Sequence, residues 1–308
     1  MKQQPFDPGL TQKYTGELRR AVNKDGSFNV YRRGSRLTDH SFYQFLITIP
    51  WIQFHIIVLI TYVTLNSIFA GLYMLAGIEH LQGADTSTPI EAFLSAFFFS
   101  IHTFTTVGYG TIAPKGIGVN IIAAVEAITG LMSLALATGL LFGRFSKPSA
   151  NISFSSNAII APYQGKTSLQ FRIVNRRKIN LLEMEANVLL MTVDKSSPTP
   201  IRKYFQLPLE RPSVYFFPLP WTIVHPIDKS SPLHGNTPDD LAKVHAEILI
   251  LIKGFDETFG QTVHTRYSYR FDEIIWGAKF IPAFSIDDNG DVVLHLDDIN
   301  KMERIDLT

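Results

Sequence analysis

The pattern of apolar and polar residues divides the chain into an apolar half and a half with short alternating runs. Residues 51–76 contain no Asp, Glu, Lys or Arg, and residues 119–145 contain only Glu126 and Arg144. A helix needs roughly 20 apolar residues to cross a bilayer, so both runs are long enough. A third apolar run, residues 89–104, is too short to cross. The pattern predicts two membrane-spanning helices with a short apolar helix between them.

The short apolar run opens with a helix-start signal. Thr88 is a capping residue, Pro89 suits the first helical position, and Glu91 completes a capping-box pattern. A helix that ends halfway through the membrane would direct its negative carbonyl end toward the membrane centre. A cation at that place would be stabilised.

A glycine-containing loop follows this short helix: Thr106, Val107, Gly108, Tyr109 and Gly110. The loop matches the filter sequence of potassium channels residue for residue, so we recognise a known motif here. Four such loops can present rings of backbone carbonyls to a dehydrated K⁺, and glycine permits the left-handed backbone that this requires. The alternative is an ordinary glycine-rich turn. The apolar flanks disfavour it, because irregular backbone at membrane depth must be buried in protein or line a cavity.

Ahead of the first long run, residues 38–46 form a short amphipathic segment. Phe42, Phe45 and Leu46 fall on one helical face, opposite polar residues. This pattern predicts a helix that lies along the inner membrane face. A plain juxtamembrane linker remains the alternative, because so short a segment gives a weak periodicity signal.

From residue 148 the chain changes to short runs rich in β-branched and aromatic residues, separated by turn residues and prolines. The runs are residues 167–174, 186–193, 214–217, 246–252, 262–269, 273–280 and 292–296. They predict an all-β sandwich. The exception is Thr237 with the Pro-Asp-Asp that follows it, which predicts a short capped helix.

Composition narrows the function. Hydrophobic residues make up 46% of the 308 residues, which fits a membrane protein. The formal net charge of +1 makes nucleic acid an improbable partner, and without cysteine there is neither a disulfide framework nor thiolate chemistry. We expect no cleavable signal peptide, since the N-terminal residues lack an apolar core segment.

Basic residues mark the membrane orientation. Arg32 and Arg33 precede the first long run, and Arg144 and Lys147 follow the second, whereas Lys115 is the one basic residue other than histidine in the intervening loops. The positive-inside rule then predicts that both termini are cytoplasmic. The expected organisation is a flexible N-terminus (residues 1–30), an interfacial helix with a transmembrane pore domain (31–147), and a cytoplasmic β-sandwich domain (148–308).

Further motifs make the resemblance specific. They are Phe97-Phe98-Phe99-Ser100, Arg144-Phe145-Ser146-Lys147-Pro148, Trp221-Thr222-Ile223-Val224-His225-Pro226-Ile227-Asp228 and Asp272-Glu273-Ile274-Ile275-Trp276-Gly277. With these the chain, over about residues 30–296, resembles the prokaryotic inward-rectifier potassium channels (the KirBac group). The resemblance implies a homotetramer in the inner (plasma) membrane and an immunoglobulin-like cytoplasmic domain. It also implies K⁺ as the permeant ion without an organic cofactor, and modulation by anionic phospholipids. A channel is not expected to be an enzyme.

The resemblance places a gate where the second spanning helices of the copies cross. By motif position the gate side chains are Leu134 and Phe142, which stand about two helical turns apart and can therefore face one axis. Their alternative role is packing between helices. Gly130 is a candidate hinge, or else a contact point for a neighbouring helix.

Two residues are candidates for supporting the filter, and four for binding lipid. Glu126 is an intramembrane carboxyl group, which is functional by default. It lies near the outer end of its helix, where it can brace the filter, and contact with ions is the alternative. His102 replaces the glutamate of many eukaryotic relatives, and Thr111 and Ile112 replace their arginine, so His102 is expected to hydrogen-bond a neighbour instead. Arg32, Arg33, Arg144 and Lys147 are the expected lipid contacts, with a purely topological role as the alternative.

Strong rectifiers carry an acidic residue on the inner helix, where this chain has Leu134. We therefore expect only weak block by polyamines or Mg²⁺.

Two other functions are possible from sequence alone. In a membrane-anchored binding protein, the β-sandwich would recognise a lipid or a partner and the pore would conduct little. An enzyme or metal site could use His225, Asp228, His245, Glu247 and His264, but their spacings match no known catalytic or metal motif. Both are weaker than a K⁺ channel.

Overall fold

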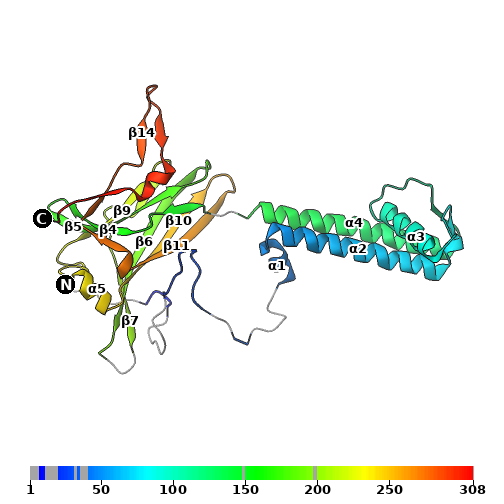
Figure 1. Cartoon of the computed structure of the whole chain (residues 1–308), viewed down its shortest axis with the longest axis horizontal. Helices are drawn as coiled ribbons and strands as arrows, with labels where there is room; N and C mark the ends of the chain where they lie inside the picture. The colour runs from blue at the N-terminus through cyan, green and yellow to red at the C-terminus, as the bar shows by residue number, and fades with distance from the viewer. Residues whose placement is uncertain are drawn as a thin grey trace. The chain divides into compact units, whose positions relative to one another are not determined.

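The computed structural model describes residues 7–10, 20–30, 33–34, 41–147, 150–196 and 200–307. The chain forms two compact units (Figure 1). The pore unit is Arg33–Lys147, and the β unit combines Met1–Arg32 with Pro148–Thr308. Each unit is described by itself.

The pore unit contains the two predicted long helices. Its elements are α1 (Phe42–Thr48), α2 (Trp51–Ala76), η2 (Ile78–His80), β1 (Leu81–Gln82), α3 (Pro89–Phe104), β2 (Ala113–Pro114) and α4 (Ile117–Phe145). Helices α2 and α4 have 26 and 29 residues and are long and apolar enough to cross a membrane. They run side by side, α3 packs against both, and α1 packs against α4 (Figure 1). The prediction of two spanning helices with a short apolar helix between them is confirmed.

The start of α3 follows the sequence signal in part. Thr88 caps the helix by accepting a hydrogen bond from the Glu91 N–H, and Pro89 occupies the first turn. The Glu91 carboxylate, however, accepts from the Thr88 hydroxyl at 2.8 Å instead of from the Thr88 N–H. Half of the capping box is therefore formed.

The amphipathic segment forms α1, capped by Ser41, whose hydroxyl accepts from the Gln44 N–H. Leu46 is buried, whereas Phe42 and Phe45 are exposed. The predicted helix start at residue 38 lies outside the described residues.

The β unit is a sandwich of two five-stranded sheets, as predicted. One sheet has the order β11 (Gln261–Arg270), β10 (Glu247–Asp256), β6 (Leu181–Asp194), β7 (Ile201–Gln206), with β8 (Ser213–Phe216) also paired to β6. The other has the order β12 (Ile274–Trp276), β4 (Ala158–Tyr163), β5 (Lys166–Asn175), β3 (Ile152–Phe154), with β9 (Trp221–Ile227) also paired to β5. All these pairs are antiparallel except β12 with β4. Apolar side chains of both sheets, such as Phe171 and Ile248, form one core.

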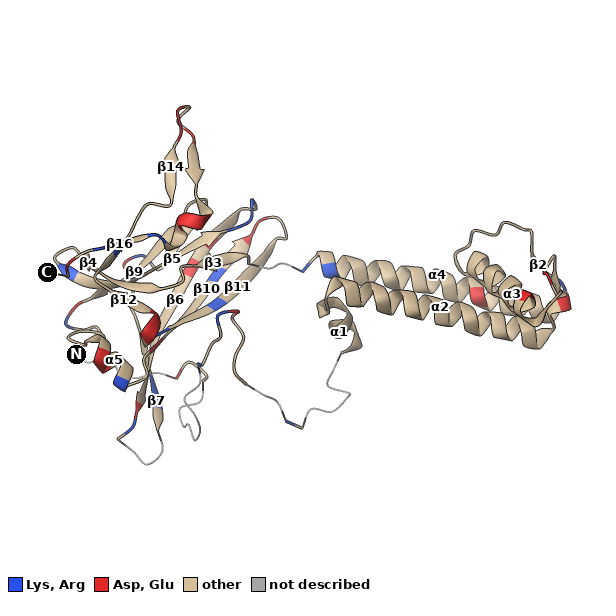
Figure 2. Cartoon of the chain, viewed as in Figure 1, with Lys and Arg blue, Asp and Glu red and all other residues tan. Residues whose placement is uncertain are grey.

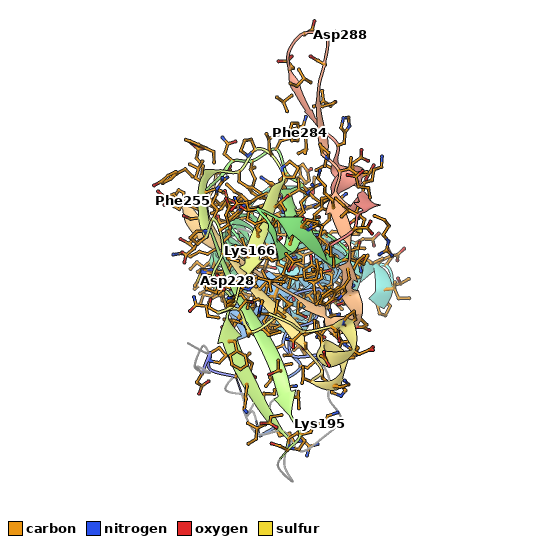
Figure 3. The ribbon with its side chains drawn as sticks, turned by 90° about the vertical axis from the view of Figure 1, so that its left-hand side faces the viewer. Lys166, Lys195, Asp228, Phe255, Phe284 and Asp288 are labelled. Atoms are coloured by element: carbon orange, nitrogen blue, oxygen red, sulfur yellow. The ribbon has the colours of Figure 1, made fainter. Side chains whose placement is uncertain are left out.

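Smaller elements complete the β unit: α5 (Pro238–Lys243), η3 (Phe271–Glu273), β13 (Ala278–Phe280) paired with β16 (Met302–Arg304), β14 (Phe284–Ile286) paired with β15 (Val292–Leu294), and η4 (Leu296–Asn300). The β14–β15 hairpin projects from the unit, with Asp288 at its tip (Figure 3). Helix α5 has the predicted cap, because Thr237 and Asp240 form a reciprocal capping box.

One expected strand is interrupted. The predicted run 273–280 divides into β12 and β13 at Gly277, which has φ +65°. The Gly277 N–H donates to the carbonyl of Ile160 at 3.0 Å. A left-handed residue breaks the extended geometry that a continuous strand needs.

Residues 20–30 differ from the expected flexible N-terminus. Val22 is buried, and its N–H donates to the Glu247 carboxylate. The Arg20 guanidinium forms an ion pair with Glu273. Buried or half-buried acidic partners therefore hold this polar segment, and its composition alone did not show that.

Candidate ion-conduction site

The filter loop has a backbone of alternating handedness. Thr106, Gly108 and Gly110 have φ values of +60°, +56° and +80°, and the two residues between them do not have positive φ. Left-handed backbone at every second residue lets successive carbonyls face the same side, as a ladder of oxygen ligands requires. The glycines explain two of these positions. Thr106 does not follow from composition, because a positive φ is uncommon for any residue but glycine.

The end of α3 holds the inner part of the loop. The carbonyl of His102 accepts hydrogen bonds from the N–H groups of Val107 at 2.9 Å and of Gly108 at 3.2 Å, and the Thr106 N–H donates to Thr103 at 3.1 Å. The loop thus directs N–H groups back to the helix.

His102 also contacts the loop through its side chain. Its ring packs edge-on against the Tyr109 ring, with 4.8 Å between centroids. The sequence predicted a hydrogen bond to a neighbour, and the structure shows an aromatic contact and main-chain hydrogen bonds instead. Both contacts brace the loop.

The candidate gate residues share one face of α4. Leu134 and Phe142 are 66% and 72% exposed, and Thr138 between them is exposed too. Spacings of four residues place the three side chains roughly above one another. The structure therefore brings both candidates to one uncovered face of the helix.

Gly130 makes a close approach to α3. A Cβ atom at this position would collide with the carbonyl oxygen of Phe104, the last residue of α3, and α4 runs through Gly130 without interruption. This geometry supports the contact role left open by the sequence. A hinge at Gly130 stays a prediction.

Glu126 is buried and links three helices. Its carboxyl group accepts from the Tyr73 hydroxyl of α2 at 2.5 Å and contacts the Ser100 hydroxyl of α3. Ser100 in turn donates to Asn66 of α2 at 3.0 Å. The sequence singled out Glu126 but not these partners, because the partners lie far away along the chain.

Arg144 is bound by protein groups at the junction of α1, α2 and α4. Its guanidinium donates to the carbonyls of Leu46 at 2.5 Å and Ile49 at 2.8 Å. It also lies over the rings of Trp51 and Phe54, at 4.5 and 4.6 Å from their centroids. Arg144 therefore connects the end of α1 to both long helices. In the sequence, Trp51 and Phe54 at the start of α2 could have indicated that Arg144 has aromatic partners within the protein.

Of the other candidate lipid contacts, Lys147 lies three residues beyond Arg144, and its N–H donates to the Arg144 carbonyl at 3.5 Å. Arg33 and Lys147 are exposed, and Arg32 lies outside the described residues. Figure 2 shows that charge is sparse along the two long helices.

Two residues of the enzyme alternative, His225 and Glu247, make structural contacts. His225 is buried, its ring nitrogens contact the carbonyl of Pro208 at 2.6 Å and the hydroxyl of Ser231 at 2.8 Å, and burial lowers its pKa. The Glu247 carboxylate accepts backbone N–H groups of the N-terminal segment. Within the described part of the chain, no group of three or more His, Asp or Glu side chains could hold a metal ion. The structure therefore gives no support to a metal or hydrolase site.

A channel-forming membrane protein is defined by these features together: the two long apolar helices α2 and α4, the short helix α3, and the loop whose backbone alternates in handedness. Residues 51–147 match the family model described as "Ion channel", and residues 152–308 match "Inward rectifier potassium channel C-terminal domain". The chain belongs to the prokaryotic inward-rectifier potassium channels. The resemblance seen in the sequence is confirmed, and with it a role in potassium transport across a membrane.

Relatives from bacteria and mammals agree with this assignment. The inward rectifier potassium channel Kirbac3.1 of Paramagnetospirillum magnetotacticum is 36% identical over 271 residues, which cover 86% of this chain and 90% of that protein. The human G protein-activated inward rectifier potassium channel 2 is 28% identical, covering 88% of this chain and 69% of its own length. The mouse G protein-activated inward rectifier potassium channel 3 is 29% identical, with coverages of 92% and 78%. A solved structure, "AvmM Catalyzes Macrocyclization in Alchivemycin A Biosynthesis", is 12% identical over 40% of this chain and 89% of its own, and its TM-score of 0.22 supports no inference.

Proposed function

We propose that this protein is a homotetrameric, K⁺-selective channel of the inner (plasma) membrane, with both termini in the cytoplasm. Thr106, Val107, Gly108, Tyr109 and Gly110 form its filter. The observation that carries the proposal is the alternating backbone at residues 106, 108 and 110, held directly at the end of a capped half-helix. The pore domain is residues 31–147, and residues 148–308 form the cytoplasmic domain. The channel needs no organic cofactor and has no enzymatic activity.

The exposure of the pore unit supports assembly with further copies of the chain, of which the proposal has four around one axis. The chain itself buries only 22% of the most apolar stretch of α2 and 11% of that of α4. Residues 105–111 of the filter loop are exposed as well. Lipid can cover apolar helix faces but supplies no ligands to a K⁺ ion, so other copies of the same loop must complete the carbonyl cage.

Ion flux into liposomes tests the filter. We expect K⁺ and Rb⁺ to permeate the reconstituted protein and Na⁺ largely not to. Gly108→Ala should abolish flux or selectivity, because a Cβ atom strains a residue at φ +56°. Gly118→Ala is the matched control, since that glycine has no positive φ and no atom within 4 Å of an added Cβ. Equal Na⁺ and K⁺ flux through the unaltered protein would contradict the proposal.

The gate is proposed at Leu134 and Phe142. Rings of apolar side chains can close a narrow pore by excluding water. Leu134→Ala and Phe142→Ala should both raise the basal flux, whereas Leu136→Ala, on the opposite side of the helix, should not. If both gate variants conduct like the parent and still close, the gate lies elsewhere.

Anionic lipids are proposed to change activity through Arg32, Arg33, Arg144 and Lys147. Each Lys or Arg near an anionic surface contributes about 1 kcal/mol of attraction. Neutralising Arg33 and Lys147 should weaken the response to anionic lipid in vesicles. Neutralising Arg144 should also disturb the junction of α1 with the long helices, because it removes hydrogen bonds to Leu46 and Ile49. A full lipid response after neutralising all four would refute the proposal.

Block by polyamines or Mg²⁺ is proposed to be weak. Residues 127–143 of α4 contain no acidic residue that could hold a multivalent cation in the pore. Leu134→Asp should create block, because four carboxylates around one axis give a strong field in a low-dielectric wall. Current–voltage curves with internal spermine test this. Steep block in the parent would show that the deciding charges lie in the β unit.

A further inference from the structure

A fully buried polar network lies where α2, α3 and α4 meet. Asn66, Tyr73, Ser100 and Glu126 are each 0% exposed. Apolar side chains including Phe69, Ala96 and Phe99 form the neighbouring core. A polar group in such surroundings is costly unless it has a hydrogen-bond partner, so every donor and acceptor can be followed.

The orientation of the Asn66 amide is determined by its own helix. Its Nδ2 donates to the carbonyl of Tyr62 at 2.7 Å. The reversed amide would bring two oxygen atoms to that distance with no hydrogen between them. The Asn66 Oδ1 atom therefore faces Ser100, and the hydrogen in this 3.0 Å contact must come from the Ser100 hydroxyl.

A count of the available hydrogens then determines the protonation state of the Glu126 carboxyl group. Three oxygen–oxygen contacts join Tyr73 to Glu126, Ser100 to Glu126 and Ser100 to Asn66, and each needs one hydrogen. Tyr73 supplies one and Ser100 supplies one, while Asn66 Oδ1 supplies none. The third hydrogen can come only from the carboxyl group of Glu126.

We propose that Glu126 is a neutral carboxylic acid that closes a one-directional hydrogen-bond chain and positions the filter. Glu126 donates to Ser100, Ser100 donates to Asn66, Asn66 donates to the Tyr62 carbonyl, and Tyr73 donates to Glu126. In this arrangement each of the four contacts has one hydrogen. A carboxylate would leave one contact without a hydrogen and would bury a charge, and no ion pair among the described residues includes Glu126.

The chain of hydrogen bonds lies close to the filter loop along α3. Ser100 lies one helical turn before Phe104, where α3 ends, and Glu126 lies one turn before Gly130 on α4. The Glu126–Ser100 contact and the close approach of Gly130 to Phe104 thus join the same two helices at adjacent turns. Because α3 holds the filter loop through the carbonyl of His102, Glu126 is a positioning residue for the loop.

Infrared difference spectroscopy tests the protonation of Glu126 directly. The spectrum of the reconstituted full-length protein minus that of Glu126→Gln, at neutral pH, should show a carboxylic acid C=O band that shifts in D₂O. Glu79→Gln is the matched control, because Glu79 is exposed and lies outside the network, so the acid band should remain in the spectrum of this variant. A carboxylate band lost in Glu126→Gln, without an acid band, would overturn the proposal whether or not the protein conducts.

Flux measurements test the positioning role, which rests on the proposed function. Glutamine reproduces the neutral acid, with an amide N–H toward Ser100 and an oxygen toward Tyr73, so Glu126→Gln should keep flux and K⁺ selectivity near parental values. Glu126→Ala leaves buried hydroxyls without partners and should lower flux about tenfold or more. Loss of flux in a correctly assembled Glu126→Gln protein, or parental flux in Glu126→Ala, would overturn the positioning role. If the unaltered protein conducts nothing, the proposed function fails, while the infrared result still decides the state of Glu126.

Discussion

The two units of this protein bury their apolar side chains in different ways. The β unit encloses its core between two sheets, and residues such as Phe171, Ile248 and Tyr269 are almost completely covered by the chain itself. The pore unit leaves most of α2 and α4 uncovered. Apolar burial stabilises a folded chain by roughly 25 cal/mol per Å². The β unit gains that stabilisation from its own residues, whereas the pore unit depends on lipid and on other copies of the chain.

The buried polar groups of the two units also differ in what they contact. In the β unit, buried acids accept hydrogen bonds from backbone N–H groups, as Glu247 does from Ala21 and Val22. In the pore unit, the buried polar groups Asn66, Ser100 and Glu126 join one helix to another. These polar contacts, together with the apolar cluster that includes Phe69 and Phe99, set the positions of the helices. Changes at these contacts should therefore affect conduction without affecting the β unit.

The largest effect on conduction is expected at Gly130. Gly130→Val would force a side chain against the carbonyl of Phe104, which belongs to the backbone and cannot move aside cheaply. Overpacking typically costs about 1–3 kcal/mol, occasionally more, and here it would displace the helix that holds the filter. We expect flux to be lost while the β unit keeps its parental protease resistance. Gly139→Val is the control, because nothing in the chain lies within 4 Å of a Cβ atom added there. Parental flux in Gly130→Val would show that this helix contact does not control conduction.

The next prediction concerns the sandwich core, where the effect should be on the stability of the β unit and on the amount of conducting protein, not on K⁺ selectivity. Phe171→Ala removes a ring that is 1% exposed, and such a change costs about 3–5 kcal/mol of unfolding free energy. Protease digestion of the full-length protein should show earlier cleavage within residues 150–307. Molecules that still conduct should keep parental K⁺ selectivity, since the filter lies in the other unit. Phe216→Ala, at a residue 75% exposed, should change little, and loss of selectivity in Phe171→Ala would show that the units are coupled.

A smaller effect is expected from pH. Burial lowers the pKa of His225 below its ordinary value of 6.5, so the unfolded chain binds a proton more readily than the folded one. The contribution of His225 is therefore complete above about pH 6.5 and decreases as the pH falls below it. Denaturant unfolding of the β unit should become easier between about pH 7 and about pH 5. His225→Gln should be less stable at neutral pH, because it loses the contacts to Pro208 and Ser231, but it should have a flatter pH dependence. A parental pH dependence in His225→Gln would contradict this prediction.

The smallest effect is expected where the N-terminal segment joins the β unit. Arg20 and Lys24 both pair with Glu273, but the Arg20 side chain is 17% exposed and that of Lys24 is 50% exposed. Arg20→Ala should cost about 1 kcal/mol and expose residues 20–30 to protease. Lys24→Ala should cost less. Equal protease sensitivity in both variants and in the parent would show that these ion pairs do not hold the segment.

The amino-acid sequence by itself determined the main elements. The two apolar runs, the cap at Thr88 and the loop 106–110 are local patterns, and each was found where it was predicted. The sandwich followed from short alternating runs, although β3, β4, β7, β9, β14 and β16 were not predicted, because β3, β14 and β16 span only three residues, β4 and β9 contain a proline, and β7 is a short polar run. Such elements can be predicted from local sequence because the helix and strand periods relate residues that are close together along the chain.

Only the tertiary structure decided which residues meet. Tyr73 and Glu126 are 53 residues apart in the sequence, and Arg20 and Glu273 are 253 apart. The sequence around each of these residues does not indicate which distant residue it contacts. Helix packing decided that Gly130 approaches Phe104, that Arg144 binds the end of α1, and that the carboxyl group of Glu126 faces two hydroxyl groups. The physical reason is that such contacts depend on how whole elements pack, and a one-residue change in helix register would give each side chain a different neighbour.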